Sequence, residues 1–523
     1  MSEAEGAPTP TLKRITAPPL GDRAGRGMIY TAMSLVLSRP ASIIVFIASA
    51  RLLTNEQLGM VALAYSWSSI GSMITKPGFD DVLVQRTRKM KLWVNSAFWF
   101  GLLFALLGMA VILGTGIVGS FTRNDPNFAW MLFFIALAAG ADALAVIPGA
   151  FFRVNLRFAA SSLISLAVVW SSAILIIIAL LIGLGVYSQP VAMLVVITGS
   201  MLYFWRAYPV RLRATLQLRR WKYLWSLTYQ RLITRAMMML GFNGDYLALS
   251  LLQVSTAAIG SYYLAFQIMV QAQRLAGQGL ASVLMPAMSH LDIEPERQRS
   301  ALIRATRLLA VFSLPIGMGI AAASGPMIRT AFSTRYTAAI WPTFILGIGG
   351  IGLMQIVTLQ SFAAAQRRYR DETRASFGFA IGIFIWVIPF AWFWGINGAA
   401  IGVMGHYLTY PIYCTNLLAR GRMSIDQFYR ALIRPAFAAF VALAPLWIVE
   451  RLIPDTRWGD VGALAMFILI SPPIYVMVMW LIDRHRTVEV MARLRAVIPG
   501  RSRKEPPSSD NEPPNFDAIP PAR

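Results

Sequence analysis

The sequence predicts an all-α integral membrane protein with about fourteen transmembrane helices. They would form two parallel-repeat six-helix lobes around a central cleft, with two further C-terminal helices and both termini in the cytoplasm. Three observations predict this class. Of the 523 residues, 57% are hydrophobic and 14% are charged. Apolar stretches of about 20 residues, long enough to cross a bilayer, recur from residue 28 to residue 482. Basic residues gather in alternate gaps between these stretches.

The apolar stretches follow a polar segment that has no cleavable signal pattern. The sixth is short, and the seventh is interrupted by polar residues. No polar gap is long enough for a sizeable soluble domain. The expected spans are 28–50, 57–75, 96–118, 128–151, 159–184, 190–206, 232–252, 256–280, 308–328, 338–362, 375–395, 397–418, 432–452 and 459–482.

The charge distribution orients these spans. With the N-terminus in the cytoplasm, 39 of the 47 basic residues fall on the cytoplasmic side and six fall outside. The remaining two, Arg39 and Arg274, lie within spans and away from the span ends. This positive-inside bias predicts an even number of spans with both termini in the cytoplasm. It also accounts for the net charge of +23, so we expect no nucleic acid partner.

An internal repeat supports the two-lobed arrangement. The segment LGMVALAYSWSSIGSMITKPGFDDVLV (58–84) aligns without gaps with IGSYYLAFQIMVQAQRLAGQGLASVLM (259–285) at an offset of 201, which pairs Gly59 with Gly260. Six spans per repeat is an even number. The halves would therefore be parallel copies related by an axis along the membrane normal, as in many transporters.

The expected organisation follows from the spans and the repeat. The linker between the lobes is rich in basic and aromatic residues, which suits a helix on an anionic membrane surface and makes membrane lipids expected partners. The segments are a polar cytoplasmic N-terminus (1–27), an N-lobe (28–208), a basic amphipathic linker (209–231), a C-lobe (232–420), two further spans (421–482) and a basic, partly disordered cytoplasmic tail (483–523).

Cysteine and histidine usage argues against a metal or other cofactor. The single cysteine, Cys414, excludes an intramolecular disulfide and a cysteine-only metal site. The three histidines, His290, His406 and His485, lie far apart in the sequence. We therefore expect neither a metal site nor a cofactor.

Arg39 lies near the middle of the first span, in SLVLSRPASIIVF. It follows Gly27 by twelve residues, which places it roughly 18 Å into the bilayer. An arginine at a span centre costs about 2.5–3.5 kcal/mol even on insertion scales. Pro40 follows directly and frees a backbone carbonyl. We expect Arg39 to face a hydrated interior and to bind phosphate. The alternative is a structural ion pair with a carboxylate from another helix.

Asp245 is the carboxylate of the seventh span, in GFNGDYLAL. Asn243 and two glycines flank it, so we expect the helix to be broken there. The pair Asn243 and Asp245 would serve ion coupling, with a proton or sodium ion, or Asp245 would be the structural partner of an arginine. For Asp142 and His406, single polar residues in spans four and twelve, we expect structural roles.

The eighth span carries a polar stripe. Gln267, Gln271, Arg274 and Gln278 recur at helical spacing and share one face. Such a face should meet water or protein rather than lipid. Lys76 lies at a similar level on the repeat-equivalent second span. We expect these side chains, with Arg39, to line a cleft for an anionic headgroup, because arginine donates paired hydrogen bonds to phosphate. Snorkelling of Arg274 to the cytoplasmic surface is the alternative.

Several segments together resemble the bacterial polysaccharide flippase (Wzx-type) family of the multidrug, oligosaccharidyl-lipid and polysaccharide exporters. The segments are ARLLTNEQLGMVALAYSW (50–67), GFDDVLVQR (78–86), NSAFWFGLLFALLG (95–108), FNGDYLALSLL (242–252), IGSYYLAFQI (259–268) and LMPAMSHL (284–291). The resemblance implies a fourteen-helix inner-membrane flippase with a cationic cleft. It would move an undecaprenyl-pyrophosphate-linked oligosaccharide to the periplasmic leaflet by alternating access, for exopolysaccharide or lipopolysaccharide biosynthesis, beside a polysaccharide polymerase and export machinery.

Three other readings compete with a flippase. A multidrug exporter of the same fold would favour an acidic cleft, because its cargo is cationic. A membrane enzyme, such as an O-antigen polymerase, ligase or glycosyltransferase, would carry a large outside loop or paired acids at its start. The outside loops here are short, and Asp80–Asp81 is cytoplasmic with no nearby histidine, so we expect no enzymatic activity. The third is a structural assembly factor for export.

Overall fold

The computed structural model describes residues 20–78, 90–123, 125–154, 158–208, 212–213, 217–289, 295–366, 368–419, 423–454, 456–482 and 484. Most of the N-terminal segment and nearly all of the tail expected from the sequence lie outside these ranges. In the helix that holds the polar stripe, side chains are described only as far as Ala272.

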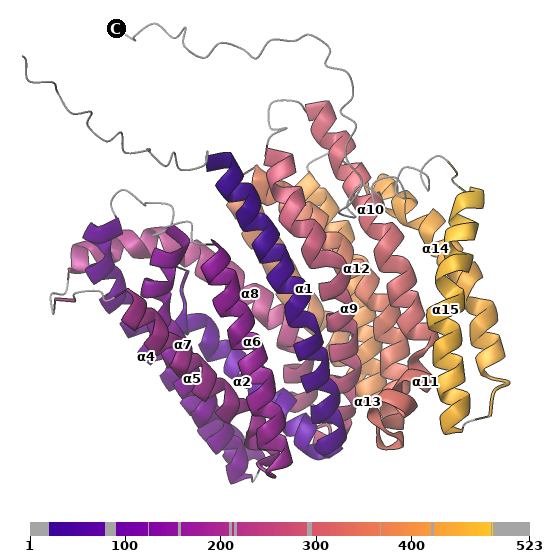
Figure 1. Ribbon diagram of the computed structural model, residues 1–523, viewed down its shortest axis with the longest axis horizontal. Coiled ribbons are helices and arrows are strands. Elements are labelled where there is room, and N and C mark those ends of the chain that lie inside the picture. The colour runs from indigo at the N-terminus through magenta and orange to yellow at the C-terminus, as the bar shows by residue number, and fades with distance from the viewer. Residues whose placement is uncertain are drawn as a thin grey trace, which may run out of the picture.

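The described residues form helices and no strands, which confirms the all-α class (Figure 1). Each expected span coincides with a helix or with part of one. The long helices are α1 (Leu20–Leu52), α2 (Asn55–Thr75), α4 (Met90–Arg123), α5 (Pro126–Val154), α6 (Phe158–Leu181), α7 (Ser188–Ala207), α8 (Leu218–Leu251), α9 (Thr256–Ser289), α10 (Pro295–Ala322), α12 (Ile340–Ala365), α13 (Tyr369–Ala419), α14 (Ile425–Glu450) and α15 (Arg457–Ile482). Short turns are η2 (Gly185–Tyr187), α11 (Ser324–Met327), η3 (Ile328–Phe332) and η4 (Thr334–Ala339).

Ten helices within the described ranges are long and apolar enough to cross a membrane. The helices α2, α8 and α9, which coincide with the expected second, seventh and eighth spans, are not among them. The helix α13 counts once, although its 51 residues would extend about 76 Å, more than twice the hydrocarbon core. The total of fourteen and the cytoplasmic placement of the termini therefore stay predictions.

The helix α13 is divided near its middle. Trp394 has φ −126° and Gly395 has φ 55°, so the chain leaves helical geometry at these two residues. The two halves then pack closely, because a Cβ on Gly398 would collide with the carbonyl oxygen of Phe390. The break lies at the boundary expected between the spans 375–395 and 397–418.

The helices pack into two bundles with a pair of helices beside them. In the first bundle α1 packs on α6, α2 on α4, and α5 on both α4 and α7. In the second, α12 packs on α9, α10 and α13, and α13 also packs on α8. We call these bundles the N-lobe (α1–α7) and the C-lobe (α8–α13). Figure 1 shows the N-lobe at the left, and α14 and α15 at the right edge, where α14 packs on α10.

The lobes meet where α2 crosses α9. A Cβ on Gly59 would collide with the carbonyl oxygen of Thr256, and a Cβ on Gly260 would collide with that of Asn55. The two contacts are related by the same offset of 201 residues as the sequence repeat. Each helix therefore offers the other an equivalent patch, as elements related by a two-fold axis do. Glycine is needed at both positions, because only its bare backbone permits this approach.

The expected break in the seventh span is wrong, because α8 continues unbroken through GFNGDYLAL. The glycines serve packing instead of a bend. A Cβ on Gly241 would collide with the ring of Phe379, and one on Gly244 would press on Ile383 and Phe384. The bare helix surface thus lets the large side chains of α13 approach α8.

The same helix takes in much of the expected linker, since α8 begins at Leu218. Its first turns pack on α4 of the N-lobe. The indole nitrogen of Trp221 donates to the carbonyl of Ser96 at 3.1 Å. Trp225 stacks on Phe104 with 5.7 Å between ring centroids.

We predict that Gly395→Ala destabilises the protein by about 1–3 kcal/mol, because φ 55° with ψ −130° is a backbone conformation that residues with a Cβ rarely adopt. Thermal unfolding of the purified protein in detergent measures the difference. Gly462→Ala is the control, because a Cβ there meets open space on a regular helix. Equal unfolding temperatures for wild type and Gly395→Ala would contradict the assigned break.

Candidate functional site

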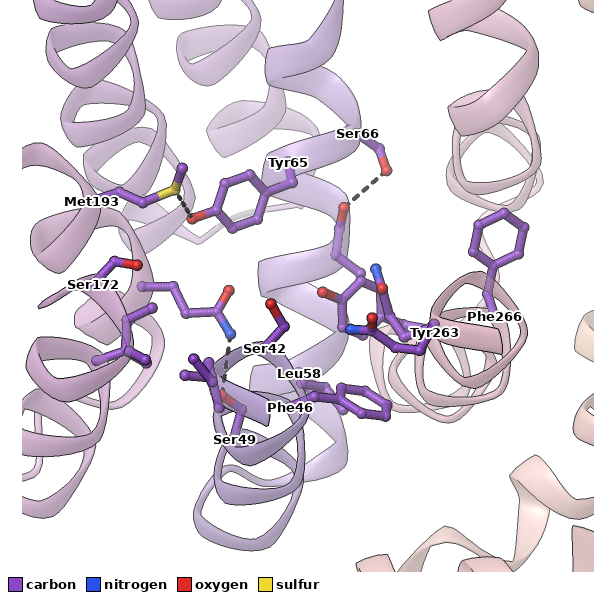
Figure 2. A pocket seen from close by; sticks show the side chains of 18 of the residues that line it. Ser42, Phe46, Ser49, Leu58, Tyr65, Ser66, Ser172, Met193, Tyr263 and Phe266 are labelled. Carbon is purple, nitrogen blue, oxygen red and sulfur yellow. Dashed lines mark hydrogen bonds between the residues drawn. The ribbon is translucent and has the colours of Figure 1, made fainter. Parts of the chain in front are cut away.

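A cavity of about 380 Å³ lies between the two lobes. Its walls come from α1, α2, α6 and α7 of the N-lobe and from α8 and α9 of the C-lobe. In Figure 2, Met193 and Ser172 lie on one side of the cavity, and Tyr263 and Phe266 lie on the other. The lining residues are Ala41, Ser42, Val45, Phe46, Ser49, Leu58, Ala62, Tyr65, Ser66, Val169, Ser172, Ala173, Ile176, Gln189, Met193, Asn243, Tyr246, Tyr263, Phe266, Gln267 and Gln271.

The described lining is polar and aromatic but carries no charged side chain. Its amides are Gln189, Asn243, Gln267 and Gln271. Its aromatic rings are Phe46, Tyr65, Tyr246, Tyr263 and Phe266. Concave sites with apolar and aromatic walls and a few convergent polar groups are typical of small-ligand binding.

Some of these polar groups are already hydrogen-bonded within the protein. Gln189 donates to the hydroxyl of Ser49 at 3.2 Å. Tyr65 directs its hydroxyl toward the sulfur of Met193 at 3.5 Å, as Figure 2 shows. In contrast, Oε1 of Gln271 is buried and has no hydrogen-bond partner. A buried acceptor without a partner costs about 1–3 kcal/mol, which a bound ligand or water would recover.

Two arginines join the lobes at the end of the bundle where α1 gives way to α2. Arg51 donates to the backbone carbonyls of Ala331 and Thr330 at 2.8 and 2.9 Å. In return, Arg335 donates to the carbonyls of Arg51 and Leu53 at 3.1 and 3.3 Å. The two side chains thus clamp the end of α1 to η3 and η4 of the C-lobe.

Further hydrogen bonds surround this clamp. Asn55 donates to the hydroxyl of Ser261 at 3.3 Å and to the carbonyl of Arg335 at 3.0 Å. Tyr336 donates to the carbonyl of Leu53 at 3.2 Å. We call these contacts, together with the glycine crossing of α2 and α9, the seal. Because the seal joins one lobe to the other, opening the cavity at this end requires these bonds to break.

Arg39 is half-buried on α1, close to the cavity but outside its lining. It lies between Leu37, whose carbonyl accepts from the indole of Trp170 at 3.2 Å, and Ala41, which lines the cavity. Arg39 therefore belongs to the edge of the cavity rather than to its wall.

The structure brings three of the candidate side chains together and separates others. Gln267, Gln271 and Asn243 line the cavity from α9 and α8. Lys76 does not, since it forms a half-exposed ion pair with Asp142 that ties the end of α2 to α5. The side chains of the other two stripe residues, Arg274 and Gln278, fall outside the described residues.

Asp245 lies behind the cavity wall, inside the C-lobe. It is 1% exposed, and its Oδ2 accepts a hydrogen bond from Tyr262 at 2.7 Å. Its Oδ1 has no partner, and neither do the buried hydroxyls of Tyr246 and Tyr407 nearby. No basic residue in the described part of the chain pairs with Asp245. The hypothesis of a structural pair between Asp245 and Arg39 therefore finds no support in these contacts.

Sequence reasoning missed two kinds of residue. Arg51 and Arg335 were counted only as charges of outside segments, and nothing in the local sequence indicates that they meet. Tyr65, Tyr246 and Tyr263 line the cavity. From the sequence alone, a tyrosine within an apolar span is interpreted as part of the hydrophobic core. Their place on the faces of α2, α8 and α9 that look across the lobe boundary is the signal that a helical projection could have used.

The comparisons with known proteins support both fold and family. The structure is similar to a solved structure of the lipid II flippase MurJ in an inward closed conformation, with a TM-score of 0.70 at 14% identity, covering 88% of this chain and 99% of that one. It is also similar to an inward-facing multidrug resistance MATE family transporter of the MOP superfamily, with a TM-score of 0.57 at 14% identity and 77% and 99% coverage. The eukaryotic MATE transporter AtDTX14 gives 0.52 at 11% identity, with 79% and 99% coverage.

A search of the curated proteins finds no match. The family model described as "Polysaccharide biosynthesis protein" matches residues 49–341, which is more than half of the chain and includes α2, most of the cavity lining and the seal. With two membrane-helix bundles around a cavity, a fold shared with MurJ and the MATE transporters, and this family match, the chain belongs to the polysaccharide biosynthesis protein family.

Proposed function

We propose that the protein is a flippase that moves an undecaprenyl-pyrophosphate-linked oligosaccharide across the bacterial inner membrane by alternating access. It would serve exopolysaccharide or lipopolysaccharide biosynthesis and would carry out no chemical step on its cargo. The proposal joins the family, which is one of polysaccharide biosynthesis, to the fold, which a lipid II flippase shares. A polysaccharide polymerase and export machinery would take up the product.

One observation carries the proposal: the lobes that line the cavity are joined at one end by hydrogen bonds that cross from lobe to lobe. Such a cavity can change sides when the seal breaks and the opposite ends of the lobes come together. If the positive-inside orientation holds, the seal lies at the periplasmic end, and this conformation has its outer side closed.

A multidrug exporter is the rival of the same fold. Its cationic cargo would call for carboxylates in the cavity, yet no acidic residue lines the part that the structure describes. The nearest buried carboxylate, Asp245, stands behind Tyr246 and already accepts from Tyr262. The neutral lining therefore favours a lipid-linked sugar over an organic cation.

Asp245 is the candidate for coupling to an ion gradient. A buried ionised carboxylate without a basic partner is costly, so it is expected to hold a proton or a small cation. Tyr246 lies next to it in sequence and also lines the cavity, and its ring packs edge-on against Tyr262 at 5.5 Å. Binding of a proton or a small cation at Asp245 would thus affect Tyr262 and Tyr246, and through Tyr246 it would affect the cavity wall.

Locking the seal should stop transport. In a Cys414→Ala background, the pair Asn55→Cys and Ser261→Cys replaces side chains that touch across the lobes at 3.3 Å. Oxidation should abolish polysaccharide export, and reduction should restore it. Surface polysaccharide in a strain carrying only this copy measures the effect.

The matched control is Thr306→Cys with Thr358→Cys, whose hydroxyls lie 3.2 Å apart between α10 and α12 within the C-lobe. Its disulfide should leave export intact, because it joins no moving parts. Full export with the seal cross-linked would sink the alternating-access proposal.

Arg39→Ala should reduce export at least tenfold while the protein still inserts. A hydrogen bond from a charged group contributes about 1.5–3 kcal/mol. Arg39 lies within an expected span and beside the cavity, where it could donate such a bond to the cargo. Quantifying surface polysaccharide against protein abundance in membranes tests this. Arg430→Ala serves as control, since Arg430 forms an exposed pair with Asp426. Wild-type output from Arg39→Ala would remove this arginine from the cargo path.

Asp245→Asn should make transport insensitive to the driving ion. An asparagine cannot exchange a proton and binds a cation weakly. The measurement is uptake of lipid-linked glucose into the protected leaflet of proteoliposomes under an imposed proton or sodium gradient. Wild type should respond to one of the two gradients, and the variant to neither. An undiminished gradient response in the variant would refute the coupling role.

A further inference from the structure

We infer that the cavity holds the uncharged sugar of the cargo, while the pyrophosphate lies outside it, on the side away from the seal. This inference rests on the proposed function and divides the cargo between two places. It differs from the sequence-based expectation that Gln267 and Gln271 act with arginines on a phosphate.

The neutral lining argues against a phosphate inside the cavity. A pyrophosphate carries at least two negative charges, and burying them without a basic partner is strongly unfavourable. None of the described residues in the wall is basic. The amides and hydroxyls could satisfy hydrogen bonds but could not balance the charge.

The polar groups suit a sugar. A sugar hydroxyl both donates and accepts, and a carboxamide offers both functions in one side chain. Gln267 makes no side-chain hydrogen bond within the described part of the protein, and Oε1 of Gln271 is buried without a partner. The side-chain nitrogen of Asn243 donates a hydrogen bond to the carbonyl of Met239 at 3.0 Å, and its side-chain oxygen can still accept one.

Aromatic rings complete the site. Tyr65 lies on α2, and Tyr263 and Phe266 lie on α9, so rings reach the cavity from both lobes, as Figure 2 shows. Aromatic walls with a few polar groups that fix orientation are the usual composition of a site for a compact organic ligand. A sugar ring presents C–H faces for the rings and a hydroxyl rim for the amides.

The directions in which the helices run indicate at which end of the cavity the pyrophosphate would lie. Both α2 and α9 begin at the seal, where Gly59 and Gly260 meet, whereas α1 ends there, so α1 and α9 run in opposite directions. The lining residues of α1, from Ala41 to Ser49, lie between Arg39 and the end of α1 at the seal. Arg39 precedes the first of them by two positions. Arg39 therefore lies on the side of the α1 lining that is away from the seal, where the pyrophosphate would lie.

This arrangement predicts selectivity for a neutral sugar next to the lipid. A uronic acid of similar size would bring a carboxylate into a wall that has no basic partner for it. The affinity gained from the sugar should be lost when the sugar is acidic, although the lipid and the pyrophosphate are unchanged.

The test uses the purified full-length protein in nanodiscs and three probes: undecaprenyl pyrophosphate, its glucose conjugate and its glucuronic acid conjugate. The Kd of each is measured by native mass spectrometry at several lipid concentrations. The glucose conjugate should bind about tenfold more tightly than the bare lipid, which corresponds to about 1.4 kcal/mol. The glucuronic acid conjugate should show no such gain.

Gln267→Leu and Gln271→Leu should each lower the affinity for the glucose conjugate toward that of the bare lipid. Gln366→Leu is the matched control, because Gln366 binds Gln298 at 3.1 Å away from the cavity and its loss should leave the preference for glucose in place. Loss of preference in the first two variants alone supports the sugar site.

Two results would overturn the inference: equal affinity of the wild type for all three probes, or a gain for the glucuronic acid conjugate that matches the gain for glucose. In both cases the proposed function survives, because the lipid pyrophosphate still binds. If the wild type binds none of the probes, the proposed function fails instead.

Discussion

The crossing of α2 and α9 at Gly59 and Gly260 is the contact on which the rest of the arrangement depends. It brings the two lobes to backbone distance at one end, and that distance lets Arg51 and Arg335 reach carbonyls on the opposite lobe. Any larger residue at either glycine would part the helices and leave these hydrogen bonds too long. Leu58, the neighbour of Gly59 on α2, lines the cavity, so the cavity lies directly beside this crossing.

Much of the helical fold could be predicted from the sequence, because membrane-spanning helices are encoded in local hydropathy. The repeat offset even indicated that Gly59 and Gly260 are equivalent, and the polar stripe placed Gln267 and Gln271 on an inward face. What could not be predicted depends on contacts between distant segments. The pairing of Lys76 with Asp142 is one example, since neither residue signals the other.

Charge is distributed unevenly over the protein, and each part has a different physical reason. Basic residues outside the expected spans are predicted to balance an anionic membrane surface and to set the orientation. Arg51 and Arg335 instead satisfy carbonyls that short turns leave without partners. The described cavity wall is neutral, because charges there would have to be paired or hydrated. The resemblance to a family with cationic clefts therefore describes the edge of this cavity, at Arg39, better than its wall.

The unbroken course of α8 has a mechanical consequence. Its first turns are anchored to the N-lobe through Trp221, and its last turns are packed into the C-lobe through Gly241 and Gly244. A helix of 34 residues, about 51 Å long, is thus fastened at both ends to bodies that would tilt relative to each other in the proposed transport cycle. Tilting would bend the helix like a leaf spring, storing elastic energy in one state and returning it in the other. In that case, the bending stiffness of α8 between the lobes would set how readily the lobes tilt and how fast each transport cycle runs.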